Sequence, residues 1–97
     1  MVPGPIPVHS VVPVDAASAV VLCVARPNRR SLVLFNNSTQ YLYVLYGTGC
    51  TTASFTIKIP PGWWGTMPWG GVYEGIMTGI WAGADASGNA QVTELVN

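Results

Sequence analysis

The chain has 97 residues, a formal net charge of zero at pH 7 and 8% charged residues, against about 25% in an average globular domain. This length allows one domain with one modest hydrophobic core. Four basic residues balanced by four acidic ones argue against a nucleic-acid-binding surface, which needs several Lys or Arg against phosphates. So few charges protect a free monomer poorly against self-association. We therefore expect partner proteins to cover much of its surface.

Neither a membrane helix nor a secretory signal is indicated. The longest apolar run, residues 19–25, is well short of the ~20 residues that a spanning helix needs. Prolines also stand near the N-terminus, where a signal peptide has a basic stretch followed by an apolar helix. We expect a protein made and used without secretion by that route. In that setting we expect Cys23 and Cys50 to be buried or idle thiols, with a disulfide as the alternative.

Residues 1–14 predict an extended arm. A helix is excluded, and a polyproline-like conformation favoured, by four prolines: Pro3, Pro5, Pro7 and Pro13. Such an arm cannot bury itself, so it is either disordered or laid along a neighbour. Its valines and Ile6 favour the second alternative. We therefore predict that the arm precedes a domain of residues 15–97 and binds an adjacent copy or another protein.

The rest of the chain predicts strands and turns only. β-branched and aromatic runs indicate the strands, and clusters such as residues 26–28, 36–39 and 60–62 indicate turns. The predicted strands are residues 18–25, 31–35, 41–47, 54–59, 63–69, 72–84 and 90–96. About seven short strands at this spacing are typical of a sandwich or small barrel. We predict an all-β fold, a single antiparallel β-sandwich of jelly-roll or Ig-like type.

The residues that catalysis requires are sparse. The single histidine, His9, lies in the predicted arm, and with two cysteines it gives too few ligands for a zinc cage. Glu74 and Glu94 could be imagined as a glycosidase pair. We expect them instead to be solvated or to pair with a cation: Arg29, Arg30 or Lys58. The sequence therefore predicts a protein that is not an enzyme and that uses no cofactor and no metal.

Four tryptophans are present: Trp63, Trp64, Trp69 and Trp81. Neighbours on a strand face opposite sides, so one of Trp63 and Trp64 is expected in the core and the other outside. For the outward side chain we favour a protein interface, where tryptophan is enriched. A platform for sugars and an ordinary exposed aromatic are the alternatives.

Residues 41–46 are apolar on both faces, as in a strand covered on both sides. A sandwich of this size covers one face of each sheet by itself, so we expect a partner subunit on the other face. The candidate interface residues are Pro3, Pro5, Ile6, Pro7, Val8, Tyr41, Tyr43, Trp63, Trp64 and Trp69.

Three runs carry a resemblance to a known group: RRSLVLFNNSTQYLYVLYGTG, SFTIKIPPG and GIMTGIWAGADASGNAQVTELV. Over residues 26–96 the chain resembles small virion proteins of tailed bacteriophages, although the Trp-rich residues 63–69 depart from the group's pattern. The resemblance implies a β-sandwich component of the phage particle, a head decoration (cement) or head-fibre-like protein on the capsid. It implies as partners the major capsid protein and copies of itself, as a homotrimer.

By the same resemblance the chain would be made in the host bacterial cytoplasm and located in the virion. Two alternatives stay open. One is another virion position, in the tail, the head–tail connector or the baseplate. The other is a carbohydrate-binding or host-adhesion module that uses Trp63, Trp64 or Trp69.

Overall fold

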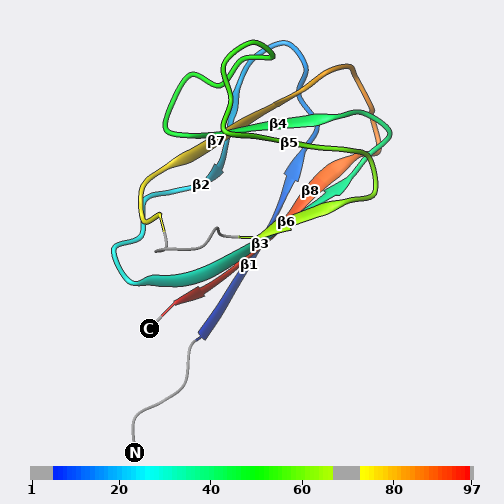
Figure 1. Cartoon of the computed structure of the whole chain (residues 1–97). Helices are drawn as coiled ribbons and strands as arrows, with labels where there is room; N and C mark the ends of the chain where they lie inside the picture. The colour runs from blue at the N-terminus through cyan, green and yellow to red at the C-terminus, as the bar shows by residue number, and fades with distance from the viewer. Residues whose placement is uncertain (1–5, 67–72, 97) are drawn as a thin grey trace, which may run out of the picture.

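The computed structural model describes residues 6–66 and 73–96, and these residues form eight strands and no helix (Figure 1). The strands are β1 (Ile6–Pro13), β2 (Val20–Cys23), β3 (Arg29–Asn37), β4 (Leu42–Tyr46), β5 (Ile57–Ile59), β6 (Trp64–Thr66), β7 (Met77–Trp81) and β8 (Asn89–Val96). In this part of the chain nothing resembles a helix long and apolar enough to cross a membrane.

The strands form two antiparallel sheets of four, which confirms the all-β prediction. One sheet has the order β1-β8-β3-β6 and the other the order β2-β7-β4-β5; Figure 1 shows the first below the second. The pairings β1–β8, β2–β7, β3–β6 and β4–β5 are those of one long hairpin with its tip at the β4–β5 connection. The further pairings β3–β8 and β4–β7 arise because this hairpin is rolled into two layers.

Side chains of both sheets meet in one hydrophobic cluster. Leu32 and Leu34 of β3 and Leu42 and Val44 of β4 are buried in it, because alternate strand residues point to the same face. Trp81 of β7 is its largest fully buried side chain. Burying an aliphatic or aromatic side chain of this kind stabilises the fold by about 1.5–3 kcal/mol. The shared cluster is what holds the two sheets together.

Residues 6–13, which the prolines predict to lie in an arm outside the domain, form strand β1 at the edge of the first sheet. They pair with β8 along their whole length. Val12 and Val14 pack against the core. Prolines are compatible with this position because an edge strand uses only alternate N–H groups in its ladder. The earlier part of the predicted arm, with Pro3 and Pro5, lies outside the described residues.

Other element boundaries differ from the prediction. The asparagines predicted as a turn, Asn36 and Asn37, are the last residues of β3. Strand β5 begins at Ile57, after a loop of residues 47–56 in which Gly47 and Gly49 adopt positive φ. The left-handed conformation that these glycines supply ends the extended run. In the predicted strand of residues 63–69 only Trp64–Thr66 is a strand, and residues 67–69 lie outside the description.

Candidate functional site

The outer side of the β1-β8-β3-β6 sheet is a surface whose paired positions carry no charge, and the exposed Arg30 stands at its border, in the bulge next to Ser31. Its residues alternate with the buried ones along each strand, and the strand register places them in rows across the sheet. We call this surface the neutral face. It consists of Pro7, His9, Val11 and Pro13 of β1, Asn89, Gln91, Thr93 and Leu95 of β8, Ser31, Val33, Phe35 and Asn37 of β3, and Trp64 and Thr66 of β6.

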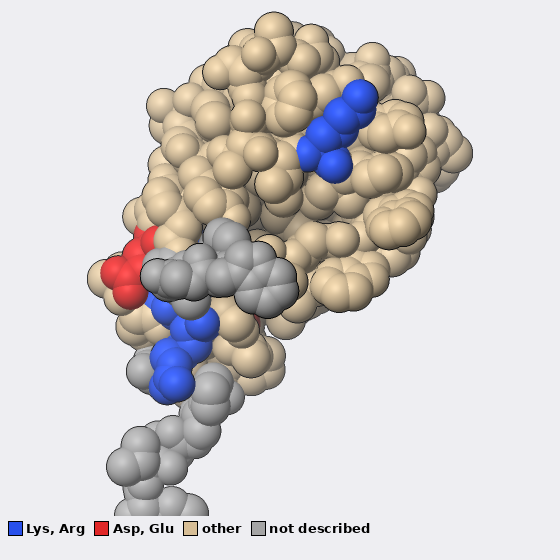
Figure 2. All heavy atoms as spheres, viewed as in Figure 1, with Lys and Arg blue, Asp and Glu red and all other residues tan. Residues whose placement is uncertain are grey.

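Large apolar side chains make up much of the neutral face. Trp64 is 61% exposed and Val11 is 51% exposed, and Val33 and Leu95 are exposed as well. Phe35 stands between Gln91 and Trp64 in one row of the register. Single exposed apolar residues are normal on a protein surface, whereas a contiguous group on one sheet face marks an interaction site. The low charge of the chain is visible in Figure 2, where coloured atoms cover little of the side shown.

Five polar side chains of the neutral face are linked by hydrogen bonds to one another. Asn37 Nδ2 and Gln91 Nε2 donate to Asn89 Oδ1, at 3.3 and 2.7 Å. Gln91 Oε1 lies 3.0 Å from His9 Nε2, and His9 Nδ1 lies 2.8 Å from Thr93 Oγ1. Because these groups already bond one another, a partner that covers them leaves fewer without a hydrogen bond than it would if they bonded only water. The free-energy cost of removing water from them is therefore reduced.

The free edge of β1 is poor in hydrogen-bond donors. Val14 N donates to Gly88 O at 3.2 Å, which continues the β1–β8 register by one pair. Even-numbered residues therefore direct their N–H groups toward β8, and odd-numbered ones direct theirs outward. Two of the outward positions, Pro7 and Pro13, have no N–H at all. The edge is thereby protected against the addition of another strand.

Trp63 and Trp64 are both exposed, at 63% and 61%, so the prediction that one of them fills the core is wrong. Strand β6 begins at Trp64, and its inward position is Gly65, where an added Cβ would lie 3.4 Å from Ile59 Cδ1. There is no room for a tryptophan at that position. The core tryptophan is Trp81.

Trp81 reaches a buried polar node that the sequence does not reveal. Its Nε1 donates to Asn36 Oδ1 at 3.1 Å, and Asn36 is fully buried. Asn36 Nδ2 in turn donates to the carbonyl oxygens of Gln40 and Ile59, at 2.8 and 2.9 Å. A side chain with both donors and its acceptor in use ties β3 to β7 and to the end of β5 and orders the turn before β4.

The outer side of the other sheet is partly covered by the chain itself, which corrects the expectation of a bare second face there. Tyr43 packs edge-on against Phe55 of the β4–β5 loop, with ring centroids 4.9 Å apart. The Lys58 ammonium lies 4.6 Å from the Tyr41 ring centroid. Cys50 N donates to Thr78 Oγ1 at 3.4 Å, and the Cys50 side chain is buried against the sheet. Tyr41 and Val21, 43% and 47% exposed, remain open on this side of the molecule.

The glutamates of the imagined glycosidase pair have different environments. Glu94 is buried and accepts hydrogen bonds from Arg29 Nε at 2.7 Å and Arg26 Nε at 3.0 Å, which confirms its expected pairing with Arg29. The Arg29 side chain is fully buried and also donates to the carbonyl oxygens of Val24, Tyr73 and Gly75. Glu74 is exposed. A carboxylate held by two guanidiniums is a structural anchor.

Both cysteines are free and buried. Burial raises the pKa of the Cys23 thiol, an effect that the nearby Arg29 opposes. Burial likewise raises the pKa of the Cys50 thiol. Such thiols are poor nucleophiles and poor metal ligands, because the thiolate is the reactive form. Across residues 6–66 and 73–96 there is no group of three or more His, Cys, Asp or Glu side chains that could hold a metal ion.

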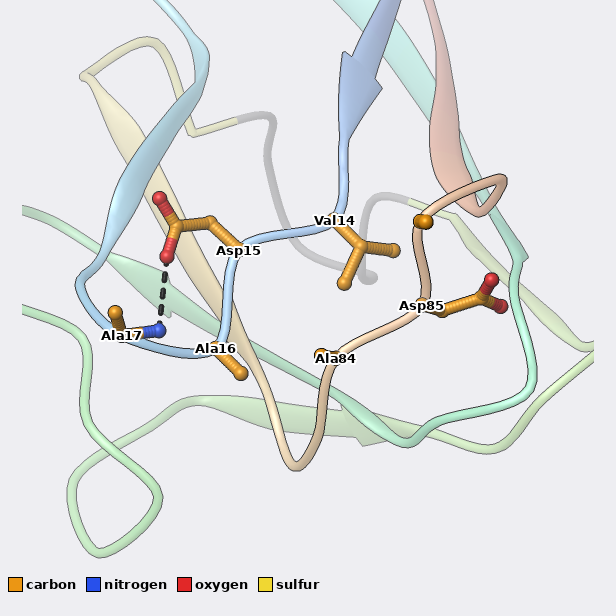
Figure 3. Close-up of a pocket in the computed structure, with 7 residues that line it drawn as sticks. Val14, Asp15, Ala16, Ala17, Ala84 and Asp85 are labelled. Carbon is orange, nitrogen blue, oxygen red and sulfur yellow. Dashed lines mark hydrogen bonds between the residues drawn. The ribbon is translucent and has the colours of Figure 1, made fainter.

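A hollow of about 530 Å³ lies between the β1–β2 and β7–β8 connections (Figure 3). Val14 and four alanines supply much of its lining, together with Asp15 and Asp85. Asp15 Oδ1 accepts hydrogen bonds from Ala17 N and Ser18 N, and in Figure 3 the Asp85 carboxylate points away from the hollow. Asp85 accepts from Thr39 N, the main reason that its pKa is lowered. Both carboxylates order loops.

The candidate interface residues therefore do not form one site. Pro7 and Trp64 lie on the neutral face. Val8 follows Pro7 on β1 and therefore points to the opposite side of the sheet, and Ile6 is exposed at the start of the strand. Tyr43 belongs to β4 of the other sheet, and Tyr41 immediately precedes that strand. Pro3, Pro5 and Trp69 lie outside the described residues.

The residues that the sequence reasoning missed are Val11, Val33, Phe35 and Leu95. The sequence signal that could have found them is the presence of apolar residues on the second face of predicted strands.

Comparisons with models of protein families, with curated protein sequences and with solved structures give no match.

Proposed function

We propose that the chain is a non-enzymatic structural protein of a bacteriophage particle, a capsid decoration (cement) protein that stabilises the head by packing against other protein subunits. The observation that carries this proposal is the neutral face. It combines exposed apolar side chains with polar groups that bond one another, and none of its positions is charged. Such a surface suits burial against protein.

The strand order supports the same proposal. A long hairpin rolled into two layers, with the orders β1-β8-β3-β6 and β2-β7-β4-β5, is the arrangement of the eight-stranded jelly roll, and we propose this fold for the chain. Viral capsid subunits use it, and so do lectins and other proteins. The fold therefore permits the function without selecting it, and the argument rests on the surface. The resemblance of residues 26–96 to phage virion proteins adds the likeness in sequence.

Incubating the purified chain with phage heads that lack it tests the proposal. We expect the chain to sediment with the heads and to raise the temperature at which they release DNA. Failure to bind, together with absence of the chain from purified particles of the phage that encodes it, would overturn the proposal. Detection in separated tails but not in heads would favour the tail, connector or baseplate alternative.

A second function is favoured by one observation. Trp63 and Trp64 are adjacent and both largely exposed, and exposed indoles stack on sugar rings. Titration with a panel of bacterial surface polysaccharides tests for a carbohydrate-binding or host-adhesion module. That function predicts a saturable change in tryptophan fluorescence that Trp63→Ala or Trp64→Ala removes. The decoration function predicts no change in fluorescence.

A further inference from the structure

We propose that the neutral face packs against the same face of a second copy of this chain, and that protonation of His9 releases the two copies. This inference deepens the proposed function and rests on it, because it names one partner of the packing surface and a condition that controls the contact. It predicts a dimer formed through a two-fold contact, in place of the trimer that the sequence resemblance implies.

Charge selects a second copy as the occupant. An average protein surface carries many charged side chains, since about a quarter of all residues are charged. Pressing such a surface onto the neutral face would bury some of those charges without partners, which is costly. The neutral face of a second copy brings no charge at any of its positions. Its exposed Val11, Val33, Trp64 and Leu95 supply the apolar area, and two sheet faces pack together readily.

The size of the face fits a reversible contact. With about 4.8 Å between strands and about 3.4 Å per residue, three long strands and one short strand present roughly 400 Å² per copy in projection. Side-chain relief adds to this, so two copies bury on the order of 1,000 Å² in total, the lower limit for a specific interface. A contact of this size is weak enough to be broken by one added charge on each copy.

The free edge of β1 is a poorer binding position for a second copy than the neutral face. Pro7 and Pro13 remove two of the outward N–H groups of β1, so a second chain that approaches along this edge cannot complete a ladder of hydrogen bonds. Approach to the face requires no backbone donors. The prolines thus direct association from the edge of β1 to the face beside it.

His9 stands on this face and can gain a proton without losing either hydrogen bond. Gln91 Oε1 is an acceptor, so His9 Nε2 carries a proton in the neutral ring, and His9 Nδ1 accepts from the Thr93 hydroxyl. When Nδ1 is protonated, the Thr93 hydroxyl rotates and accepts instead. The neighbours on the face, Thr93 and Gln91 of β8 and Pro7 and Val11 of β1, do not titrate. Glu94 lies on the opposite side of β8 and is bound to Arg29, and Arg30 stands at the bulge of β3 beside Ser31, at the end of the face where β3 begins.

Protonation therefore changes the charge of the face and leaves its hydrogen bonds in place. Histidine is the side chain that ordinarily gains its charge between pH 8 and pH 5. His9 lies on the edge strand β1, and a cation there would find no counter-charge among the residues of an opposing neutral face, so the pair of copies binds fewer protons than two separate copies. By linkage, association is strong above this range and weakens as the pH falls through it.

Sedimentation equilibrium of the full chain at pH 8.0 and pH 5.5 tests the proposal. At pH 8.0 we expect a monomer–dimer equilibrium, and at pH 5.5 a dissociation constant about tenfold higher or more. His9→Gln, which stays neutral and can bond Thr93 and Gln91, should dimerise equally at both pH values. Val33→Lys should abolish the dimer at pH 8.0, whereas Val21→Lys should leave it intact. Val21 is a matched control because it is similarly exposed, at 47% against 43%, and lies on the other sheet.

Each other outcome overturns the inference. A monomer at pH 8.0, a trimer, a dimer unaffected by Val33→Lys, or a pH response that persists in His9→Gln would each contradict it. None of these results prevents the chain from binding to heads, so the proposed function is tested separately by co-sedimentation with heads at pH 8.0. Failure of that binding with a normal pH-sensitive dimer would overturn the proposed function and leave the dimer contact standing.

Discussion

The imidazole of His9 and the amide of Gln91 face each other across the β1–β8 ladder, with Nε2 and Oε1 3.0 Å apart. The direction of this bond is fixed from the far side, because Gln91 Nε2 donates to Asn89 Oδ1 and leaves Oε1 as the acceptor. One histidine is thereby held in one orientation on a face that has no charge. A side chain that can gain a charge therefore stands among uncharged residues, and the proposed dimer depends on both properties.

Replacing Gln91 with Glu tests the relationship directly. A carboxylate at this position would stabilise the protonated imidazole, so we expect the NMR titration of His9 to move to higher pH than in the unmodified chain. The same charge on the neutral face should weaken the dimer at pH 8.0. Asn37→Asp places a carboxylate farther away in the same chain of hydrogen bonds and should move the titration less. Equal shifts in the two variants would contradict the assigned geometry.

Replacing Glu94 with Gln should destabilise the fold by about 3–5 kcal/mol, because it leaves the guanidinium of Arg29 buried without its counter-charge. Urea unfolding followed by tryptophan fluorescence measures this change. Glu74→Gln is the control at an exposed position, where we expect a change within about 0.5 kcal/mol. Comparable losses in both variants would show that the Arg29–Glu94 pair is not an anchor.

Asn36→Ala should cost about 1–3 kcal/mol or more, since it leaves buried partners without a hydrogen bond, among them Trp81 Nε1 and Ile59 O. The neighbouring Asn37→Ala removes an exposed amide of the same type and should change stability far less. The measurement is the denaturation midpoint of each variant. A neutral Asn36→Ala would mean that the buried node is dispensable.

The thiols of Cys23 and Cys50 should react slowly with a disulfide reagent such as DTNB at pH 8 in the folded chain. Burial raises the pKa of both thiols, so less thiolate is present at a given pH than in an unfolded chain. The rate should rise when the chain is unfolded in urea at the same pH. Fast reaction of either thiol in the folded chain would contradict its burial.

The sequence was informative where one strand uses one face for the core. The predicted strands of residues 31–35 and 90–96 fall within β3 and β8, and clusters of turn residues located several connections. It was less informative where local preference and tertiary position disagree. Prolines argue against a central strand, and the sequence therefore predicts an arm where β1 lies. Nothing in the local sequence indicates that the prolines stand at positions whose N–H groups would point away from β8.

The site was less predictable than the fold, for a related reason. Trp63 and Trp64 were expected on opposite sides because they are adjacent, but β6 starts at Trp64 and its inward position is Gly65. The neutral face depends on strand order and register, which bring His9, Thr93 and Val33 from distant parts of the chain into one row. No local pattern specifies that row. Buried Asn36 was unforeseeable because asparagine ordinarily favours turns.

If the chain packs as we propose, the neutral face is covered by protein in the assembled particle. The most direct test is a cryo-electron-microscopy map of the particle in which the outer side of the β1-β8-β3-β6 sheet can be seen. We expect Val33, Phe35 and Leu95 to be buried there against the same face of a second copy. A map in which the chain is present and this face is open to solvent would contradict the claim.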